Sequence, residues 1–181
     1  MNNKQIAIKL RELANELDPT GETLQGRGQI APTLWEIKIK EGQTIESTLE
    51  ECKKLFPIWR WTGDNLDQTV NSERTSKKAY TVKVRANIES DEELKNMSAD
   101  DLKEKGIVGI TLLERLQLEI DYFKETGEHL DIDNITSCTG SRDSDGDVPS
   151  VYWDSDNSKL RVFWYYPAHC HDRLRSREIK D

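Results

Sequence analysis

Long apolar runs are absent from this chain of 181 residues. Residues 1–18, MNNKQIAIKLRELANELD, alternate charged and hydrophobic side chains. No later stretch approaches the roughly 20 consecutive apolar residues that a membrane-spanning helix needs. A secretory signal also requires an apolar segment, and the amino-terminal pattern does not supply one. The sequence therefore predicts a soluble, cytoplasmic protein with no membrane partner.

Cysteine is scarce and widely spaced. The chain holds three cysteines, Cys52, Cys138 and Cys170, and no two of them form a CxxC pair. An odd number at such distances does not indicate a disulfide framework. The cysteines are therefore interpreted as free thiols.

The short motifs that carry well-known catalytic chemistry are also missing. The sequence has no HExxH, no GxSxG, no glycine-rich phosphate loop and no dinucleotide fingerprint. We therefore expect, as the first hypothesis, a non-catalytic binding protein with no cofactor and with another protein as its partner.

Acidic residues are abundant. The chain has 34 Asp and Glu against 26 Lys and Arg, which gives a net charge of −8. Such a chain repels phosphate at long range, so the charge disfavours nucleic acid as a partner. Five Trp, five Tyr and three Phe nevertheless supply enough large side chains for a hydrophobic core.

Hydrophobic periodicity predicts alternating helices and strands in the first half of the chain. The spacing predicts helices over 4–17 and 44–56, and strands over 33–40, 58–61 and 79–88. Residues 62–78 are polar and are expected to form a long loop. Capping boxes are expected to begin helices at Ser90, Ser98 and Thr111, and Gly127 to end the last of these.

The second half of the chain predicts a helix followed by strands. Alternation near 134–138, 150–153 and 160–166, with turn formers between, predicts a three-stranded antiparallel β-meander. The fold class is therefore α+β. We expect a mixed helix and strand portion over 1–88, an acidic helical connector over 89–110, and a helix plus meander over 111–181. These parts can also form one continuous domain.

An acidic loop offers a first candidate metal site. Asp143, Asp145 and Asp147 recur at every second position, as do the first carboxylates of a calcium loop. The match ends there, because Val148 replaces the glycine of the sixth position and Asp154 replaces the glutamate of the twelfth. The favoured interpretation is a solvated turn, with calcium binding as the alternative.

The segment His169-Cys170-His171 offers a second candidate. On an extended backbone both imidazoles point to one side, and they could hold zinc if a third ligand came from Cys138, His129 or the aspartate loop. The favoured interpretation is a pair of surface histidines beside a buried thiol.

The same residues could also serve catalysis. Cys170 or Cys138, a neighbouring histidine as base and Asp172 to orient it would supply the residue types of acyl transfer. The second hypothesis is therefore a metal- or thiol-dependent enzyme built from residues 138–147 and 169–172.

A third hypothesis is a nucleic-acid binder. The stretches WRW (59–61) and FWYY (163–166) mix or precede basic residues, and arginines follow at 173, 175 and 177. The favoured interpretation places the strand aromatics in the core and the three arginines in a frayed, partly neutralised end of the chain.

Overall fold

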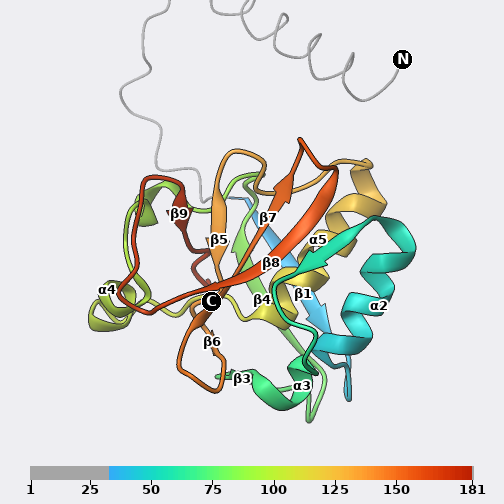
Figure 1. The fold of residues 1–181 in the computed structure, drawn as a ribbon, viewed down its shortest axis with the longest axis horizontal. Helices are drawn as coiled ribbons and strands as arrows, with labels where there is room; N and C mark the ends of the chain where they lie inside the picture. Colours follow the sequence, from blue (N-terminus) through green and yellow to red (C-terminus); the bar gives the residue numbers. More distant parts are fainter. Residues whose placement is uncertain (1–32, 181) are drawn as a thin grey trace, which may run out of the picture. The chain divides into compact units, whose positions relative to one another are not determined.

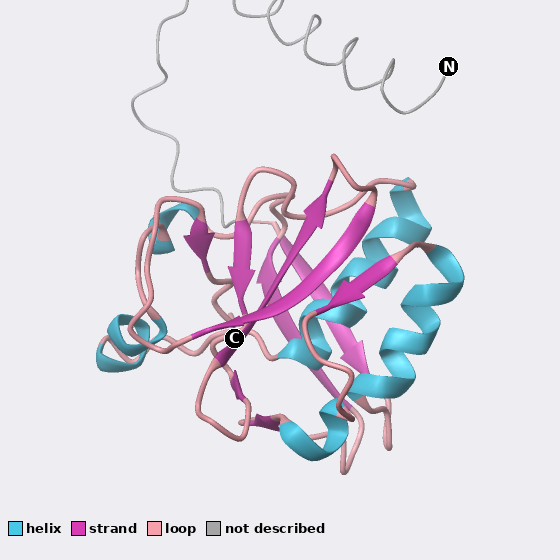
Figure 2. Cartoon of the chain, viewed as in Figure 1, coloured by secondary structure: helices cyan, strands magenta, loops and turns pink. Residues whose placement is uncertain are grey.

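The computed structural model describes residues 33–180, which lie in one compact unit (Figure 1). The predicted helix over 4–17 lies outside these residues. Helices and strands both contribute to the unit, as Figure 2 shows, so the α+β class is confirmed.

The largest sheet in the described part of the chain has five strands in the order β2-β8-β7-β5-β9. The strands β7 and β8 are antiparallel, as are β5 and β7, whereas β2 and β9 run parallel to their neighbours. The three-stranded meander is therefore not confirmed, because strands from distant residues extend this part of the fold into a mixed sheet. The strand bounds are β2 Ile58–Arg60, β5 Ile135–Ser137, β7 Val148–Asp154, β8 Lys159–Tyr165 and β9 Leu174–Arg175.

Two smaller sheets complete the strand pairing. The strands β1 (Leu34–Ile39) and β4 (Tyr80–Arg85) pair antiparallel, and β3 (Asn71–Ser72) pairs with β6 (Ser141–Arg142). The predicted alternation of β1 and β4 is confirmed, since their inward Ile and Val side chains are buried. The predicted loop over 62–78 also contains β3 and the short helix α3 (Leu66–Thr69).

The helices begin where the capping residues predict, with one exception. Capping boxes open α2 (Ile45–Leu55), α4 (Ala99–Glu104) and α5 (Leu112–Thr126). Gly127 ends α5 with a left-handed φ of +73°.

The exception is Ser90, where the prediction of a capping box that begins a helix is wrong. Only the short 3-10 helix η1 (Glu92–Leu94) follows it, without a side-chain cap. The carboxylate of Asp91 instead accepts hydrogen bonds from Arg85 and from the backbone N–H of Glu178. Contacts with distant residues therefore override the local capping pattern.

Helix α5 is the centre of the packing. It contacts α2, β1 and β7, and α2 lies beside it (Figure 1). Leu113, Leu116 and Ile120 recur along one face of the helix as a hydrophobic stripe, and all three are buried. Arg115 and Glu119, which the hydrophobic stripe does not include, are buried as well. The helix is therefore enclosed on nearly all sides along its first three turns.

A buried charge network accounts for these polar residues. The Arg115 guanidinium donates to Asp131 through Nε at 2.9 Å and to Glu119 through Nη1 at 2.7 Å. Arg177 donates to the other oxygen of Asp131 at 2.7 Å. All four side chains are fully buried, so two guanidinium groups neutralise two carboxylates inside the protein.

Arg177 also fixes the end of the chain. Its terminal nitrogens donate to the backbone oxygens of Asn87 and Ile88 at 2.7 and 2.8 Å. The expected frayed arginine terminus is therefore wrong at positions 175 and 177. Arg175 is also buried, and it pairs with Glu92 at 2.6 Å. Because these anchors hold the segment after β8 against the unit, they also position the exposed Arg173.

We predict that Arg177→Ala lowers the free energy of unfolding by about 3–5 kcal/mol, because it leaves Asp131 undercompensated in the interior. Urea denaturation followed by circular dichroism measures this loss. Lys180→Ala is the control, since Lys180 is partly exposed and its one ion pair among the described residues is with Glu178, and it should cost less than about 1 kcal/mol. Similar losses of unfolding free energy for the two variants would contradict the role of Arg177 in compensating Asp131 and fixing the end of the chain.

We also predict that Asp131 makes the stability sensitive to acid. Burial alone would raise the pKa of Asp131, but Arg177, Arg115 and a hydrogen bond from Thr136 outweigh it and lower that pKa. The stabilisation is therefore complete above the unfolded-state pKa of about 4 and disappears as the pH falls further. The difference in unfolding free energy between the natural protein and Asp131→Asn should shrink below about pH 4, as measured by urea denaturation. A difference that stays constant from pH 7 to pH 3 would contradict this.

Candidate ligand-binding groove

The five-stranded sheet buries one face and leaves part of the other accessible. Along β8, Leu160 and Val162 are fully buried, whereas Arg161, Phe163 and Tyr165 alternate with them and are only partly buried. Trp59 on β2 and Tyr152 on β7 both stand opposite Arg161, so the neighbouring strands extend this accessible face.

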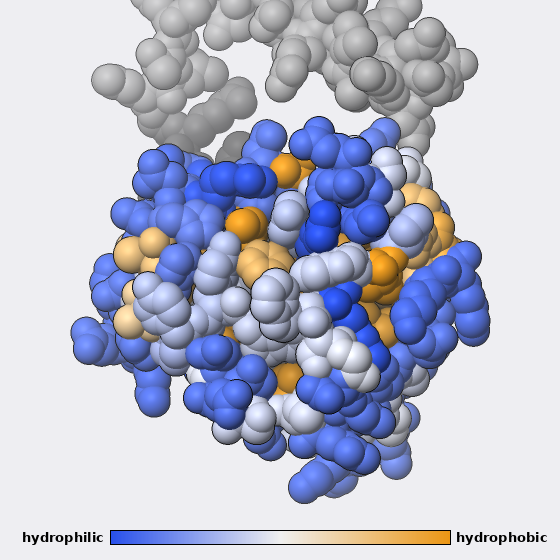
Figure 3. All heavy atoms as spheres, in the orientation of Figure 1, coloured by the Kyte–Doolittle hydropathy of each residue, from blue (hydrophilic) through white to orange (hydrophobic). Residues whose placement is uncertain are grey.

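We call the hollow on this face the aromatic groove. It is open and has a volume of about 390 Å³, within the range of ligand pockets. Figure 3, in the orientation of Figure 1, shows pale and orange side chains gathered over the middle of the molecule, with blue ones around them. The groove is lined by Trp59, Trp61, Ile135, Tyr152, Arg161, Phe163, Tyr165, His171 and Arg173.

The aromatic rings of the groove pack against one another edge to face. Tyr152 and Phe163 have ring centroids 5.7 Å apart, and Phe163 and Tyr165 are 5.1 Å apart, both near perpendicular. Trp59 and Trp61 make a similar contact at 6.1 Å, and Trp61 is 74% exposed. The groove is therefore a preformed aromatic surface on a rigid sheet.

Two arginines lie among these rings in different electrostatic situations. The Arg161 guanidinium lies 4.7 Å from the Trp59 ring centre and pairs with Asp154 at 2.7 Å. The Arg173 guanidinium lies 5.8 Å from the Tyr152 ring centre, and its Nε donates to the backbone oxygen of Asp133 at 2.8 Å. Arg173 is therefore held in place by neutral groups.

The histidines at the end of the groove have partners within the protein. His169 stacks on Tyr165 at 4.2 Å. The Nδ1 of His171 accepts the backbone N–H of Arg173 at 3.2 Å, so the neutral ring carries its proton on Nε2, which lies 3.3 Å from the Tyr165 hydroxyl. Burial, then the charges of His169 and Arg173, lower the pKa of His171. The neutral ring is therefore favoured.

Of the candidate metal ligands, the structure brings His169 and His171 together, with ring centroids 5.3 Å apart, but adds no third ligand to them among the described residues. Within residues 33–180, no group of three or more His, Cys, Asp or Glu side chains could hold a metal ion. Both ring nitrogens of His171 are already engaged. Asp143 accepts the backbone N–H groups of Asp145 and Asp147, at 3.0 and 2.8 Å, so its carboxylate stabilises the turn of the loop.

The thiols divide into two buried groups and one exposed group. Burial raises the pKa of Cys138, and burial together with the Glu119 charge raises the pKa of Cys52 to about 12. Cys170 is exposed. The third histidine, His129, hydrogen-bonds Glu119 and stacks on Trp153. A thiolate at Cys138 is therefore strongly disfavoured near neutral pH.

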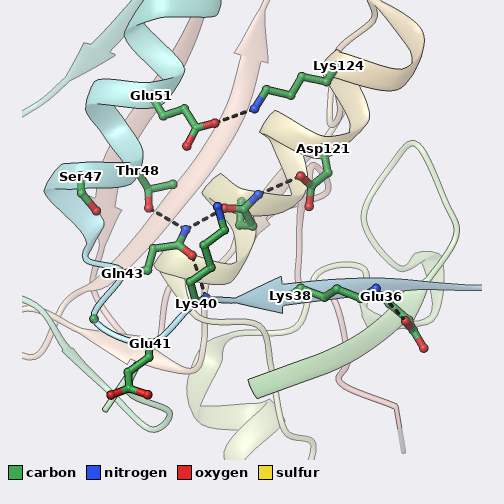
Figure 4. A pocket seen from close by; sticks show the side chains of 12 residues that line it. Glu36, Lys38, Lys40, Glu41, Gln43, Ser47, Thr48, Glu51, Asp121 and Lys124 are labelled. Atoms are coloured by element: carbon green, nitrogen blue, oxygen red, sulfur yellow. Dashed lines mark hydrogen bonds and ion pairs between the residues drawn. The ribbon is translucent and has the colours of Figure 1, made fainter. Parts of the chain in front are cut away.

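A polar cleft between β1, α2 and α5 has a larger volume than the aromatic groove, about 660 Å³ (Figure 4). Gln43 lies at its centre and donates to Thr48 and Gln117 at 3.0 and 2.7 Å. Lys124 pairs with Glu51 at 2.6 Å. Because the central amides and the Lys124–Glu51 pair are engaged within the cleft, they are less available to a ligand than the rings of the aromatic groove.

Sequence reasoning placed the groove aromatics in the core, and for Phe163 and Tyr165 that expectation is wrong. Of the stretch FWYY, only Trp164 packs against the core. The available signal was the two-residue period of β8, which puts Phe163 and Tyr165 on the same face as Arg161.

Comparisons of the chain with family models, with curated proteins and with solved structures found no match. Within the part of the chain that the structure describes, no helix is long and apolar enough to cross a membrane.

We predict that one thiol of the folded protein reacts rapidly with Ellman's reagent at pH 8, because Cys52 and Cys138 are buried and protonated. Cys170→Ser should abolish this reaction, and all three thiols of the natural protein should react in denaturant. Rapid labelling of Cys138 in the folded Cys170→Ser variant would contradict this and would favour the thiol-enzyme hypothesis.

Proposed function

We propose that this chain is a non-catalytic binding protein, that its partner is another protein, and that an extended segment of the partner binds in the aromatic groove. The observation that carries the proposal is the groove itself. Its rings lie on an accessible sheet face, hold one another in place and are flanked by arginine.

The chemistry of such a surface suits an extended peptide. Aromatic-lined grooves bind proline-rich and other extended segments, because the flat rings pack against proline and apolar side chains without deep pockets. Rings that are already ordered lose little entropy on binding. An accessible aromatic patch on a chain of low overall hydropathy also indicates an interaction surface.

The enzymatic alternative has less support. It needs a thiol activated by a neighbouring base, or a set of metal ligands. Burial disfavours the thiolate at Cys138, no hydrogen bond within residues 33–180 joins the exposed Cys170 to a histidine, and His171 has partners at both ring nitrogens. The polar cleft does not replace these groups, since Gln43 is hydrogen-bonded to Thr48 and Gln117, and Lys124 pairs with Glu51. Binding without catalysis therefore accounts better for the arrangement.

Single-stranded nucleic acid is a second candidate, because bases could stack on Tyr152, Phe163 and Tyr165 beside the two arginines. Each nucleotide carries a negative charge, however, and the chain itself has a net charge of −8. A peptide partner avoids this repulsion and is therefore preferred.

The test is selection from a phage library of random 12-residue peptides on the folded protein. Affinities of the selected peptides are then measured by tryptophan fluorescence. We expect Tyr152→Ala and Phe163→Ala each to weaken binding about tenfold or more, since each removes a large contact surface. Circular dichroism confirms that the variants fold.

Tyr166→Ala is the matched control, because Tyr166 is 58% exposed and does not line the groove. Its peptide affinity should stay within about twofold of the natural protein. A labelled ten-residue deoxythymidine oligonucleotide provides the competing assay at low salt. Selected peptides whose affinity is unchanged by both Tyr152→Ala and Phe163→Ala would overturn the proposal. Tight, groove-dependent binding of the oligonucleotide without any peptide binder would favour nucleic acid instead.

A further inference from the structure

Building on the proposed function, we propose that Arg173 binds a carboxylate of the partner segment and makes an acidic residue a requirement for recognition. The partner segment is then an extended peptide that carries one Asp or Glu beside the apolar or proline residues that pack on the rings.

The charge pairing of the arginines distinguishes Arg173. Nine arginines lie within residues 33–180, and two of them, Arg142 and Arg173, have no carboxylate within ion-pair distance in that part of the chain. Arg142 lies outside the groove and donates to the backbone oxygens of Thr139 and Ser141. Arg173 is therefore the groove arginine whose charge is not neutralised by a described carboxylate.

The geometry also prepares Arg173 to bind an anion. Its Nε is held by the backbone oxygen of Asp133, and its plane lies near the ring of Tyr152. Its backbone N–H is held by His171, so both ends of the residue are anchored. The two terminal nitrogens have no hydrogen-bond acceptor among the described residues. They form a fork that matches the two oxygens of a carboxylate.

The number of uncompensated charges favours a peptide carboxylate over a nucleic acid. The other groove arginine, Arg161, is neutralised by Asp154. One remaining guanidinium balances one carboxylate, whereas a nucleic acid strand brings one charge per nucleotide to an acidic protein. An acidic side chain next to a residue that packs on Tyr152 therefore matches both the charge and the surface.

The experiment repeats the peptide selection with the natural protein and with Arg173→Gln, both in their full-length form. We expect the natural protein to enrich Asp or Glu at a fixed spacing from proline or aromatic residues. Replacing that acid by its amide should weaken binding about tenfold or more, which is the expected value of a charge-assisted pair. Arg173→Gln should bind the acidic and amide peptides equally.

Two further variants make the result specific. Arg173→Lys keeps the charge but loses the fork, so it should recover only part of the preference for acid. Lys38→Gln makes the same charge change as Arg173→Gln at a side chain that is 75% exposed and outside the groove, and it should keep the full preference.

The outcomes separate this inference from the proposed function. Peptides that need Tyr152 and Phe163 but show no preference for acid would overturn the role of Arg173 and leave the groove as the binding surface. An acid preference that survives in Arg173→Gln would overturn it as well. Failure to select any groove-dependent peptide would overturn the proposed function first.

Discussion

The carboxylate of Asp131 is the group on which the rest of this structure depends. It is fully buried, and one oxygen faces Arg115 from the central helix while the other faces Arg177 near the end of the chain. A buried carboxylate with one of these partners missing would be strongly destabilising, so the three residues must come together or not at all. This requirement joins α5, the segment before β5 and the segment after β9 into one unit.

One side of the aromatic groove is positioned by the pairing of Asp131 with Arg177. Arg177 lies four residues after Arg173, and Leu174 and Arg175 form β9 against β5. Fixing this segment brings His171 beside Tyr165 of β8 and Arg173 beside Tyr152 of β7. The interior charges are thus neutralised in pairs, whereas Arg173, which lies over the Tyr152 ring, has no described carboxylate within ion-pair distance.

The sequence predicted the local elements better than their assembly. Helices at Thr44, Ser98 and Thr111 and the strands β1 and β4 follow from caps and alternation, which act over a few residues. The parallel pairing of β2 with β8, and the burial of Arg177, depend on partners about a hundred and about fifty residues away. Alternation identifies two faces of β8 but not which face is covered, and that ambiguity led the groove aromatics to be assigned to the core.

An accessible aromatic face needs a physical reason, because covering Phe163, Tyr165 and Tyr152 with a helix would add hydrophobic stabilisation. The same sheet already buries its other face against α2 and α5, so the core does not need these rings. Their edge-to-face contacts keep them ordered while they remain partly exposed. Three large rings that stay partly exposed contribute more stability when a ligand covers them than they do in the free protein. The proposed binding function supplies such a reason, and the charge network at Asp131 holds the segment that carries Arg173 beside the rings.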